Sequence, residues 1–178
     1  MLLSKQILGL NLRCLIVKSH FDLKGKFILG DFSQEGSDLG KFDLVVASGV
    51  LYLMVEPVRF LEKFAQLSDG LFLWTHYFDY DFSQWHPHLL SHLSKGKWNY
   101  KDPDLFHYKG LDIKVIKQEY GETLGWSGFR GGPEDYSYWI EKQGLMLLYS
   151  QLGYQNVEAA FDDIGHQNGP SVCTFATK

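Results

Sequence analysis

The chain has 178 residues, which is enough for one domain with a sizeable core and too short to expect two. Its 45% hydrophobic and 21% charged residues are ordinary for a soluble globular protein. Its formal net charge of −4 argues against a nucleic-acid backbone as the main partner, because such binding needs a basic surface. There is no apolar run long enough to span a membrane, no clear signal peptide and only two cysteines, so we expect a cytoplasmic protein with reduced thiols.

The first elements along the chain are short. Residues 1–23 are ambiguous, because the apolar run LRCLIV is too short for its periodicity to separate strand from helix. KFILGDF at 26–32 predicts a strand, and the polar SQEGSDLGK at 33–41 predicts a loop. FDLVVAS at 42–48 is almost continuously apolar, which is typical of a parallel strand covered on both faces.

The clearest predicted element is a helix that begins at Pro57, where a missing N–H costs nothing. Its apolar residues recur at helical spacing on one face: Phe60, Leu61, Phe64 and Ala65. Gly70, in the left-handed conformation, is expected to end it. LFLWTHY at 71–77 predicts the next strand, so the segment forms a right-handed parallel strand–helix–strand unit.

The second half begins with residues 80–127, which are rich in Trp, Tyr, His and Gly and predict an insertion that caps the sheet. Within it, GLDIKVIKQEYG at 110–121 predicts one or two exposed strands. GFRGGPEDYS at 128–137 predicts a loop that leads into a long helix. We expect one domain over residues 1–178.

That helix runs to about Leu152 and is stopped by Gly153. Its apolar stripe consists of Leu145, Leu148, Tyr149 and Leu152. Two final strands, VEAAFDD at 157–163 and VCTFAT at 172–177, are joined by the turn-rich IGHQNGP.

Ligands of open α/β sheets bind outside the carboxyl ends of the parallel strands. This rule places on one rim residues that are far apart in the sequence: Asp31, Phe32, Ala47, Ser48, Gly49, His76 and Tyr77. A small-small-Gly stretch such as Ala47–Gly49 lets the backbone approach a ligand closely.

Three segments, LGDF at 29–32, ASGVLYLMVEP at 47–57 and LFLWTHY, resemble the middle of a class I S-adenosylmethionine-dependent methyltransferase. The resemblance covers roughly residues 10–178. It implies a Rossmann-like α/β sheet, mostly parallel with an antiparallel C-terminal strand pair, and S-adenosylmethionine as cofactor.

The resemblance also implies roles for single residues. Asp31 and Phe32 would hold the adenine of the cofactor, although an Asp at this place also begins turns. The methionine and sulfonium region would be lined by Ala47, Ser48, Gly49 and Tyr52. Many relatives have Tyr-His where this chain has Tyr52-Leu53, which removes a polar group from the substrate side. Tyr52 in the core is the alternative.

His76 is the candidate general base, because a neutral imidazole at a strand end can take a proton as the methyl group arrives. The alternatives are a structural histidine and catalysis by alignment alone. Three further histidines lie in HPHLLSH: His86, His88 and His92. They lack a nearby carboxylate or thiolate pattern, so we expect an exposed polar segment and no metal.

The pattern GFRGGPEDYSYWI resembles a substrate-side loop of some bacterial methyltransferase-like proteins. Arg130 would hold an anionic group of the substrate, and Trp126 and Phe129 would face the substrate with it. A tight turn that starts the next helix, with Trp139 in the core, is equally compatible. HQNGPS at 166–171 also borders the predicted pocket.

In this family a glycine-rich loop and a central strand precede the segments above. Only 28 residues precede LGDF, and they contain no such loop, so we expect an N-terminally truncated sheet. Its unpaired edge at 42–48 favours a homo-oligomer. A shortened chain, a chain completed by a partner and a remnant without catalysis all fit.

The leading functional hypothesis is methyl transfer to an oxygen or nitrogen of a small molecule or of a modest polar group. A non-catalytic methyltransferase-like subunit is the second hypothesis. An NAD-type oxidoreductase of similar layout is the third, and the antiparallel final strands count against it.

Overall fold

The computed structural model describes residues 12–28, 30, 32, 39–80, 102–120 and 134–178. The chain divides into two compact units, Met1–Asp38 and Leu39–Lys178, and each is described by itself. Among the described residues no helix is long and apolar enough to cross a bilayer.

The first unit contains one described helix, residues 12–20, which resolves the ambiguity of the LRCLIV run. Residues 26–28 form no strand, so the predicted strand at 26–32 is wrong over these three residues. Their apolar side chains, Phe27 and Ile28, are exposed at 41% and 56%, and a strand needs a hydrogen-bonded neighbour that the described part of this unit does not supply.

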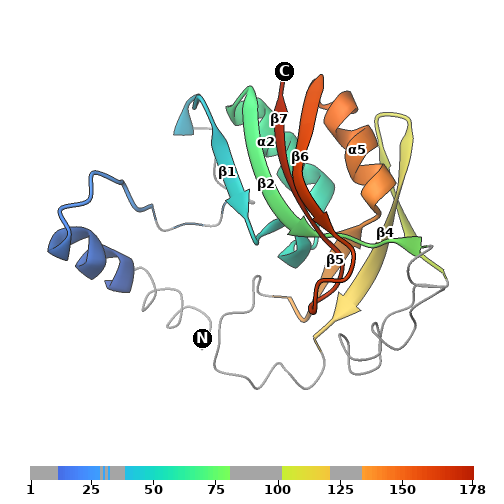
Figure 1. The fold of residues 1–178 in the computed structure, drawn as a ribbon, viewed down its shortest axis with the longest axis horizontal. Coiled ribbons are helices and arrows are strands. Elements are labelled where there is room, and N and C mark those ends of the chain that lie inside the picture. The colour runs from blue at the N-terminus through green and yellow to red at the C-terminus, as the bar shows by residue number, and fades with distance from the viewer. Residues whose placement is uncertain (1–11, 29, 31, 33–38, 81–101, 121–133) are drawn as a thin grey trace. The chain divides into compact units, whose positions relative to one another are not determined.

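The second unit is built on a four-stranded sheet with the order β1-β2-β7-β6 (Figure 1). Its strands are β1 Val45–Ser48, β2 Gly70–His76, β6 Asn156–Asp163 and β7 Ser171–Thr177. β1 and β2 run parallel and are joined by the helix α2, Pro57–Leu67, as predicted. β7 runs antiparallel to both β2 and β6, which confirms the final strand pair.

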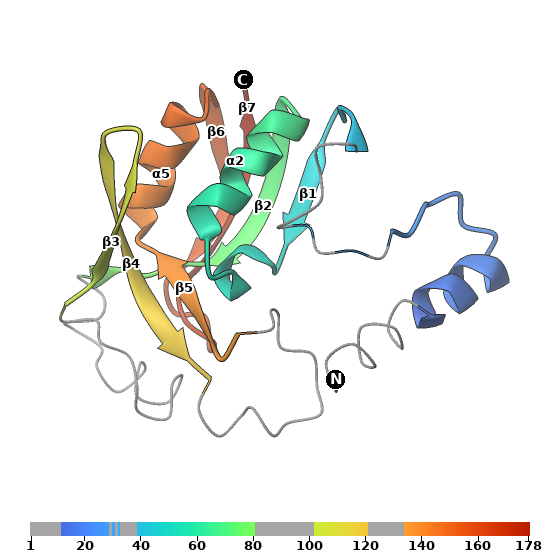
Figure 2. The same ribbon diagram turned by 180° about the vertical axis from the view of Figure 1, so that it is seen from behind.

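Two helices cover one face of this sheet, α2 and α5, Lys142–Gln151 (Figures 1 and 2). The predicted stripes are buried with two exceptions, since Phe60 and Leu152 are only partly buried. They pack on the inner face of β2 and β7, where Leu71 and Leu73 are fully buried. The Tyr149 hydroxyl shares a hydrogen bond of 2.6 Å with Thr174 Oγ1, which ties α5 to β7. Gly153, at φ +92°, follows α5 as predicted.

A second, antiparallel sheet has the order β3-β4-β5. It consists of β3 Asp104–Tyr108, β4 Leu111–Glu119 and β5 Tyr136–Ile140. β4 confirms a strand within 110–121, but Ile113 and Val115 are fully buried, so that strand is not simply exposed. The prediction of a loop that passes directly into a helix is wrong at Tyr136–Ile140, because β5 pairs with β4 along its whole length. Residues 81–101 and 121–133 lie outside the described residues, so the inserted cap stays a prediction.

Within the described part of the second unit, no helix covers the opposite face of the four-stranded sheet (Figure 1). Val46, Phe72 and Phe175 form one row across β1, β2 and β7, and Val46 is 63% exposed. The prediction that 42–48 is covered on both faces is therefore wrong for the described part of the unit. β1 is also an edge strand there, and the homo-oligomer that we expected from this edge stays a prediction.

The sequence predicted that Gly70 ends α2 in a left-handed conformation. This is wrong, because Gly70 has no positive φ and is the first residue of β2. A Cβ at this position would lie 2.9 Å from the backbone oxygen of Asp43. The requirement for glycine is therefore close packing of two backbones and not a positive φ.

We expect Leu73→Ala to lower the free energy of unfolding by about 2–5 kcal/mol, because it leaves a cavity between the sheet and its two helices. Val46→Thr lies on the neighbouring strand and on the uncovered face, and it should change the free energy of unfolding by less than about 0.5 kcal/mol. Urea denaturation measures both. Equal losses in the two variants would contradict the assignment of covered and uncovered faces.

Candidate active site

The carboxyl ends of β1 and β2 lie side by side and form the part of the predicted rim that belongs to these two strands. The chain leaves β1 through Gly49, whose φ of +73° is a left-handed conformation. The Gly49 N–H donates to the Trp74 carbonyl at 2.9 Å, and a Cβ on Gly49 would lie 3.1 Å from Cζ3 of the Trp74 ring. Glycine is required here by both its φ and the indole beneath it.

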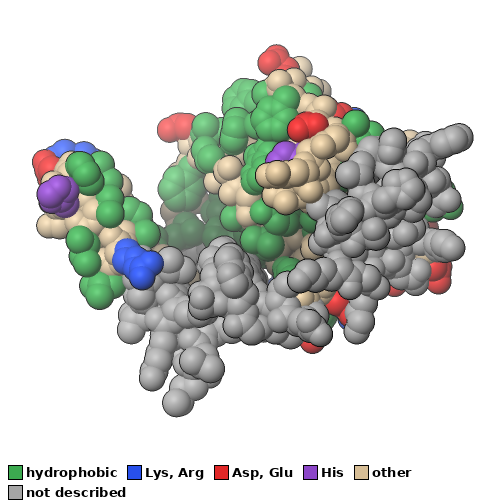
Figure 3. Space-filling model, turned by 60° about the horizontal axis from the view of Figure 1, so that its bottom comes forward, with side chains coloured by type: hydrophobic (Ala, Val, Ile, Leu, Met, Phe, Trp, Pro, Cys, Tyr) green, Lys and Arg blue, Asp and Glu red, His purple; other side chains and the backbone are tan. Residues whose placement is uncertain are grey.

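A cluster of aromatic rings surrounds His76 at the end of β2. The Trp139 ring, from β5, stacks on the imidazole with a centroid distance of 5.0 Å and an interplanar angle of 13°. Tyr52, from the short helix η2 (Leu51–Leu53), meets it edge-on at 4.7 Å. The ring centres of Trp74 and His166 lie 5.4 and 5.0 Å from the centre of the imidazole. Figure 3, which turns the bottom of Figure 1 forward, shows hydrophobic side chains over much of the described surface of this unit.

The hydrogen bonds of His76 determine which of its nitrogens carries the proton. Nδ1 lies 2.9 Å from the Gly169 carbonyl oxygen and 3.2 Å from that of Pro170. A carbonyl oxygen only accepts, so Nδ1–H donates and Nε2 carries the lone pair of the neutral ring. Within the described residues no group forms a hydrogen bond with Nε2.

Burial at the rim favours the neutral forms of its titratable groups. Burial lowers the pKa of His76, the two carbonyls oppose this, and the charge of His166 when protonated adds to it. Burial also raises the pKa of Tyr52, with a smaller contribution from Tyr120. Near neutral pH the rim therefore presents a neutral imidazole and a neutral phenol.

The structure brings three of the predicted site residues together: Gly49, Tyr52 and His76. Ser48 lies beside them, in register with Trp74. Ala47 is in register with the buried Leu73 and is only 2% exposed, so its side chain packs on the helix-covered face and only its backbone remains a candidate. Phe32 lies in the first unit. Asp31, Trp126, Phe129 and Arg130 lie outside the described residues.

Sequence reasoning missed Trp74 and the roles of His166 and Gly169. Trp74 stands two positions before His76, so the two-residue period of a strand places both on one face and was a usable signal. The 166–171 segment was predicted to border the pocket. Its carbonyl contacts with His76 depend on the pairing of β2 with β7, which local sequence does not specify.

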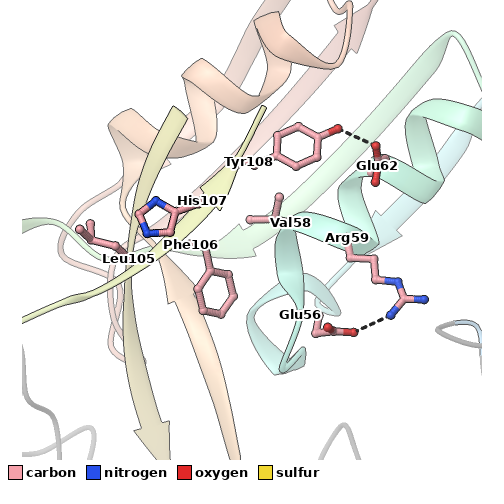
Figure 4. A pocket seen from close by; sticks show the side chains of 8 residues that line it. All are labelled: Glu56, Val58, Arg59, Glu62, Leu105, Phe106, His107 and Tyr108. Carbon is pink, nitrogen blue, oxygen red and sulfur yellow. Dashed lines mark hydrogen bonds and ion pairs between the residues drawn. The ribbon is translucent and has the colours of Figure 1, made fainter. Parts of the chain in front are cut away.

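A separate cleft of about 580 Å³ lies between α2 and β3 (Figure 4). Its charged groups are already paired, with Arg59 on Glu56 at 3.1 Å and the Tyr108 hydroxyl donating to Glu62 at 2.8 Å. That hydroxyl is also the main cause of the lowered pKa of Glu62. We place the candidate site at the His76 rim instead, because ligands of open α/β sheets bind at the carboxyl ends of parallel strands and this cleft lies away from them.

No protein-family description and no curated protein sequence matches the chain. Among solved structures it is similar to the N-terminal domain of EvdMO1 crystallised in the presence of SAH and D-fucose, at 19% identity and a TM-score of 0.62 over 92% of this chain and 59% of that one. The same domain with SAH bound gives a TM-score of 0.62 at 19% identity, over 92% and 58%.

The structure of EvdMO1 itself gives a TM-score of 0.53 at 16% identity, over 92% of this chain and 27% of that one. The chain therefore spans less than two thirds of the solved chains that it resembles. At these identities the similarity shows a shared mixed α/β fold.

The lowered pKa of His76 gives a prediction for stability. The unfolded chain binds a proton near the ordinary histidine pKa of about 6.5, and the folded chain binds it only at lower pH. The contribution of His76 is therefore present above pH 6.5 and is lost as the pH falls through the lowered pKa, with a slope of up to about 1.4 kcal/mol per pH unit.

Denaturant titrations between pH 7.5 and 5 should show a shallower loss in His76→Asn than in the wild type. The other titratable groups facing the imidazole in the described part are Tyr52 and His166, and the wild type and the variant both retain them. Identical slopes would show that burial of His76 does not perturb its titration.

Proposed function

We propose that the chain is an S-adenosylmethionine-dependent methyltransferase domain that acts on an oxygen or nitrogen of a small molecule. One observation carries the proposal: the Gly49 turn passes over Trp74 at the carboxyl end of β1, beside His76, in a fold shared with a domain crystallised with SAH. SAH is the form of S-adenosylmethionine that remains after it has given up its methyl group.

The residues present at the rim suit this cofactor. Gly49 has a positive φ and no side chain, so its backbone is bare where the methionine end would lie, beside Ser48. Tyr52 and Trp74 lie beside the Gly49 turn, and aromatic rings of this kind attract a sulfonium cation. The resemblance in sequence assigns the adenine to Asp31 and Phe32. When bound, S-adenosylmethionine supplies an activated methyl group.

The protein's own contribution to the chemistry is centred on His76. Its ring is held between Trp139 and Tyr52, and its Nε2 lone pair is directed away from the carbonyls that bind Nδ1. Nε2 would take the proton that a hydroxyl acceptor loses. Trp126, Phe129 and Arg130 would contact the substrate. The D-fucose in the EvdMO1 crystals supports a small, hydroxylated acceptor.

Isothermal titration calorimetry tests this proposal. We expect SAH and S-adenosylmethionine to bind one per chain with dissociation constants between about 1 μM and 1 mM, the range of ordinary enzyme substrates. NADH is the control and should give no binding heat. Absence of binding at millimolar SAH would favour the non-catalytic subunit, and binding of NADH alone would favour the oxidoreductase.

A further inference from the structure

We propose that the connection between β6 and β7, residues 164–170, positions the site by imposing opposite tautomers on two facing histidines. His76 is held protonated on Nδ1 and His166 on Nε2, so the pair offers one proton acceptor and one donor. The inference rests on the proposed function for its meaning in catalysis, but the tautomers themselves exist without cofactor or substrate.

The orientation of His76 is determined from two directions. The stack on Trp139 fixes the plane of the ring, at 13° between the two planes. The carbonyls of Gly169 and Pro170 converge on Nδ1 from successive residues and fix its rotation within that plane. His76 is only 5% exposed, so water competes poorly for this nitrogen. The neutral ring is therefore an acceptor at Nε2 alone.

The hydrogen bond of His166 fixes the opposite tautomer. The backbone N–H of Asn168 donates to its Nδ1 at 3.1 Å, and a nitrogen that accepts a hydrogen bond carries no proton. The proton of the neutral ring is therefore on Nε2. The two ring centres lie 5.0 Å apart, so the acceptor of one ring and the donor of the other belong to the same small part of the rim. A hydroxyl, which donates and accepts, matches this pair.

The connection can hold both rings because it is closed by its own hydrogen bonds. The Gly169 N–H donates to the His166 carbonyl at 2.9 Å, and the Gly165 N–H donates to Asp163 Oδ1 at 3.1 Å. Gly169 has a φ of +103°, a conformation that L side chains rarely adopt. This backbone conformation directs the Gly169 carbonyl at His76. Gly169 is thus a positioning residue and not a catalytic one.

Two-bond ¹H–¹⁵N NMR spectra of histidine-labelled protein at pH 8 read both tautomers directly. In the wild type we expect His76 to be protonated on Nδ1 and His166 on Nε2, each by about fivefold or more, the ratio that one net hydrogen bond sustains. Gly169→Ala should move the His76 ratio towards unity, because the backbone must rotate its carbonyl away.

Gly165→Ala is the matched control in the same connection. Its φ is not left-handed, and an added Cβ would make an ordinary contact of 3.7 Å with Asp163 Oδ1. Its spectrum should equal that of the wild type. Wild-type His76 protonated on Nε2, or His166 on Nδ1, would overturn the proposal. So would a folded Gly169→Ala variant with unchanged tautomers. If that variant does not fold, the wild-type spectrum alone decides.

The NMR result is independent of the proposed function. If both tautomers are as expected but SAH does not bind, the methyltransferase proposal is refuted and the positioning role remains intact. Binding of SAH with the reverse tautomers would do the opposite.

Discussion

Replacing His76 by asparagine is expected to slow methyl transfer by about 10²–10⁴-fold, the usual contribution of a general base. The asparagine amide can still donate to the Gly169 carbonyl, as Nδ1 does now. Nothing in that side chain replaces the Nε2 acceptor. The affinity for SAH should stay within about threefold of the wild type, because the Gly49 turn is unchanged. Conversion of S-adenosylmethionine to SAH and calorimetry measure the two effects.

His76→Gln is the companion variant. Its longer amide reaches the position of Nε2 but loses the contact with Gly169, so it should be as inactive as His76→Asn and less stable. Retention of the wild-type rate in both variants would show that methyl transfer at this rim needs alignment alone.

Replacing Gly49 by alanine is the second large effect, and it falls on cofactor binding. At φ +73° an L side chain costs about 1–2 kcal/mol, and the added Cβ would press on the Trp74 ring at 3.1 Å. We expect the affinity for SAH to fall at least tenfold, about 1.4 kcal/mol, because the methyl group pushes apart the Gly49 backbone and the Trp74 ring that would line the methionine end. Calorimetry with SAH measures this loss.

Gly110→Ala is the matched control for backbone strain. Gly110, in the β3–β4 turn, has a similar φ of +84°, and nothing lies within 4 Å of an added Cβ. Both variants should lose similar stability to the left-handed conformation, but only Gly49→Ala should lose affinity for SAH. Equal affinities in the two variants would mean that the cofactor does not lie against Gly49.

Local sequence patterns predicted the individual strands of the four-stranded sheet. The continuous apolar runs of β1 and β2, the Pro57 start of α2 and the turn-rich break before β7 are all short-range signals. β5 was missed, although Ser137 and Trp139 are buried and alternate with the partly buried Tyr136 and Tyr138. A strand of five residues beside glycines and a proline gives a weak local signal, and its pairing with β4 decides its state.

The positions of two candidate site residues were predictable where a single rule applied. Gly49 and His76 follow from the position of ligands at the carboxyl ends of parallel strands. The rule gives a strand end and not a face, and the register with Leu73 decides that the Ala47 side chain lies on the helix-covered face. The contact of Gly169 with His76 joins residues 93 positions apart, so only the assembled sheet creates it.

A crystal structure of the protein with SAH would test the central claim most directly. We predict SAH at the carboxyl ends of β1 and β2, with its methionine end against Ser48 and Gly49 and its sulfur toward His76. SAH bound elsewhere, as in the cleft between α2 and β3, would contradict the assignment of the active site to this rim.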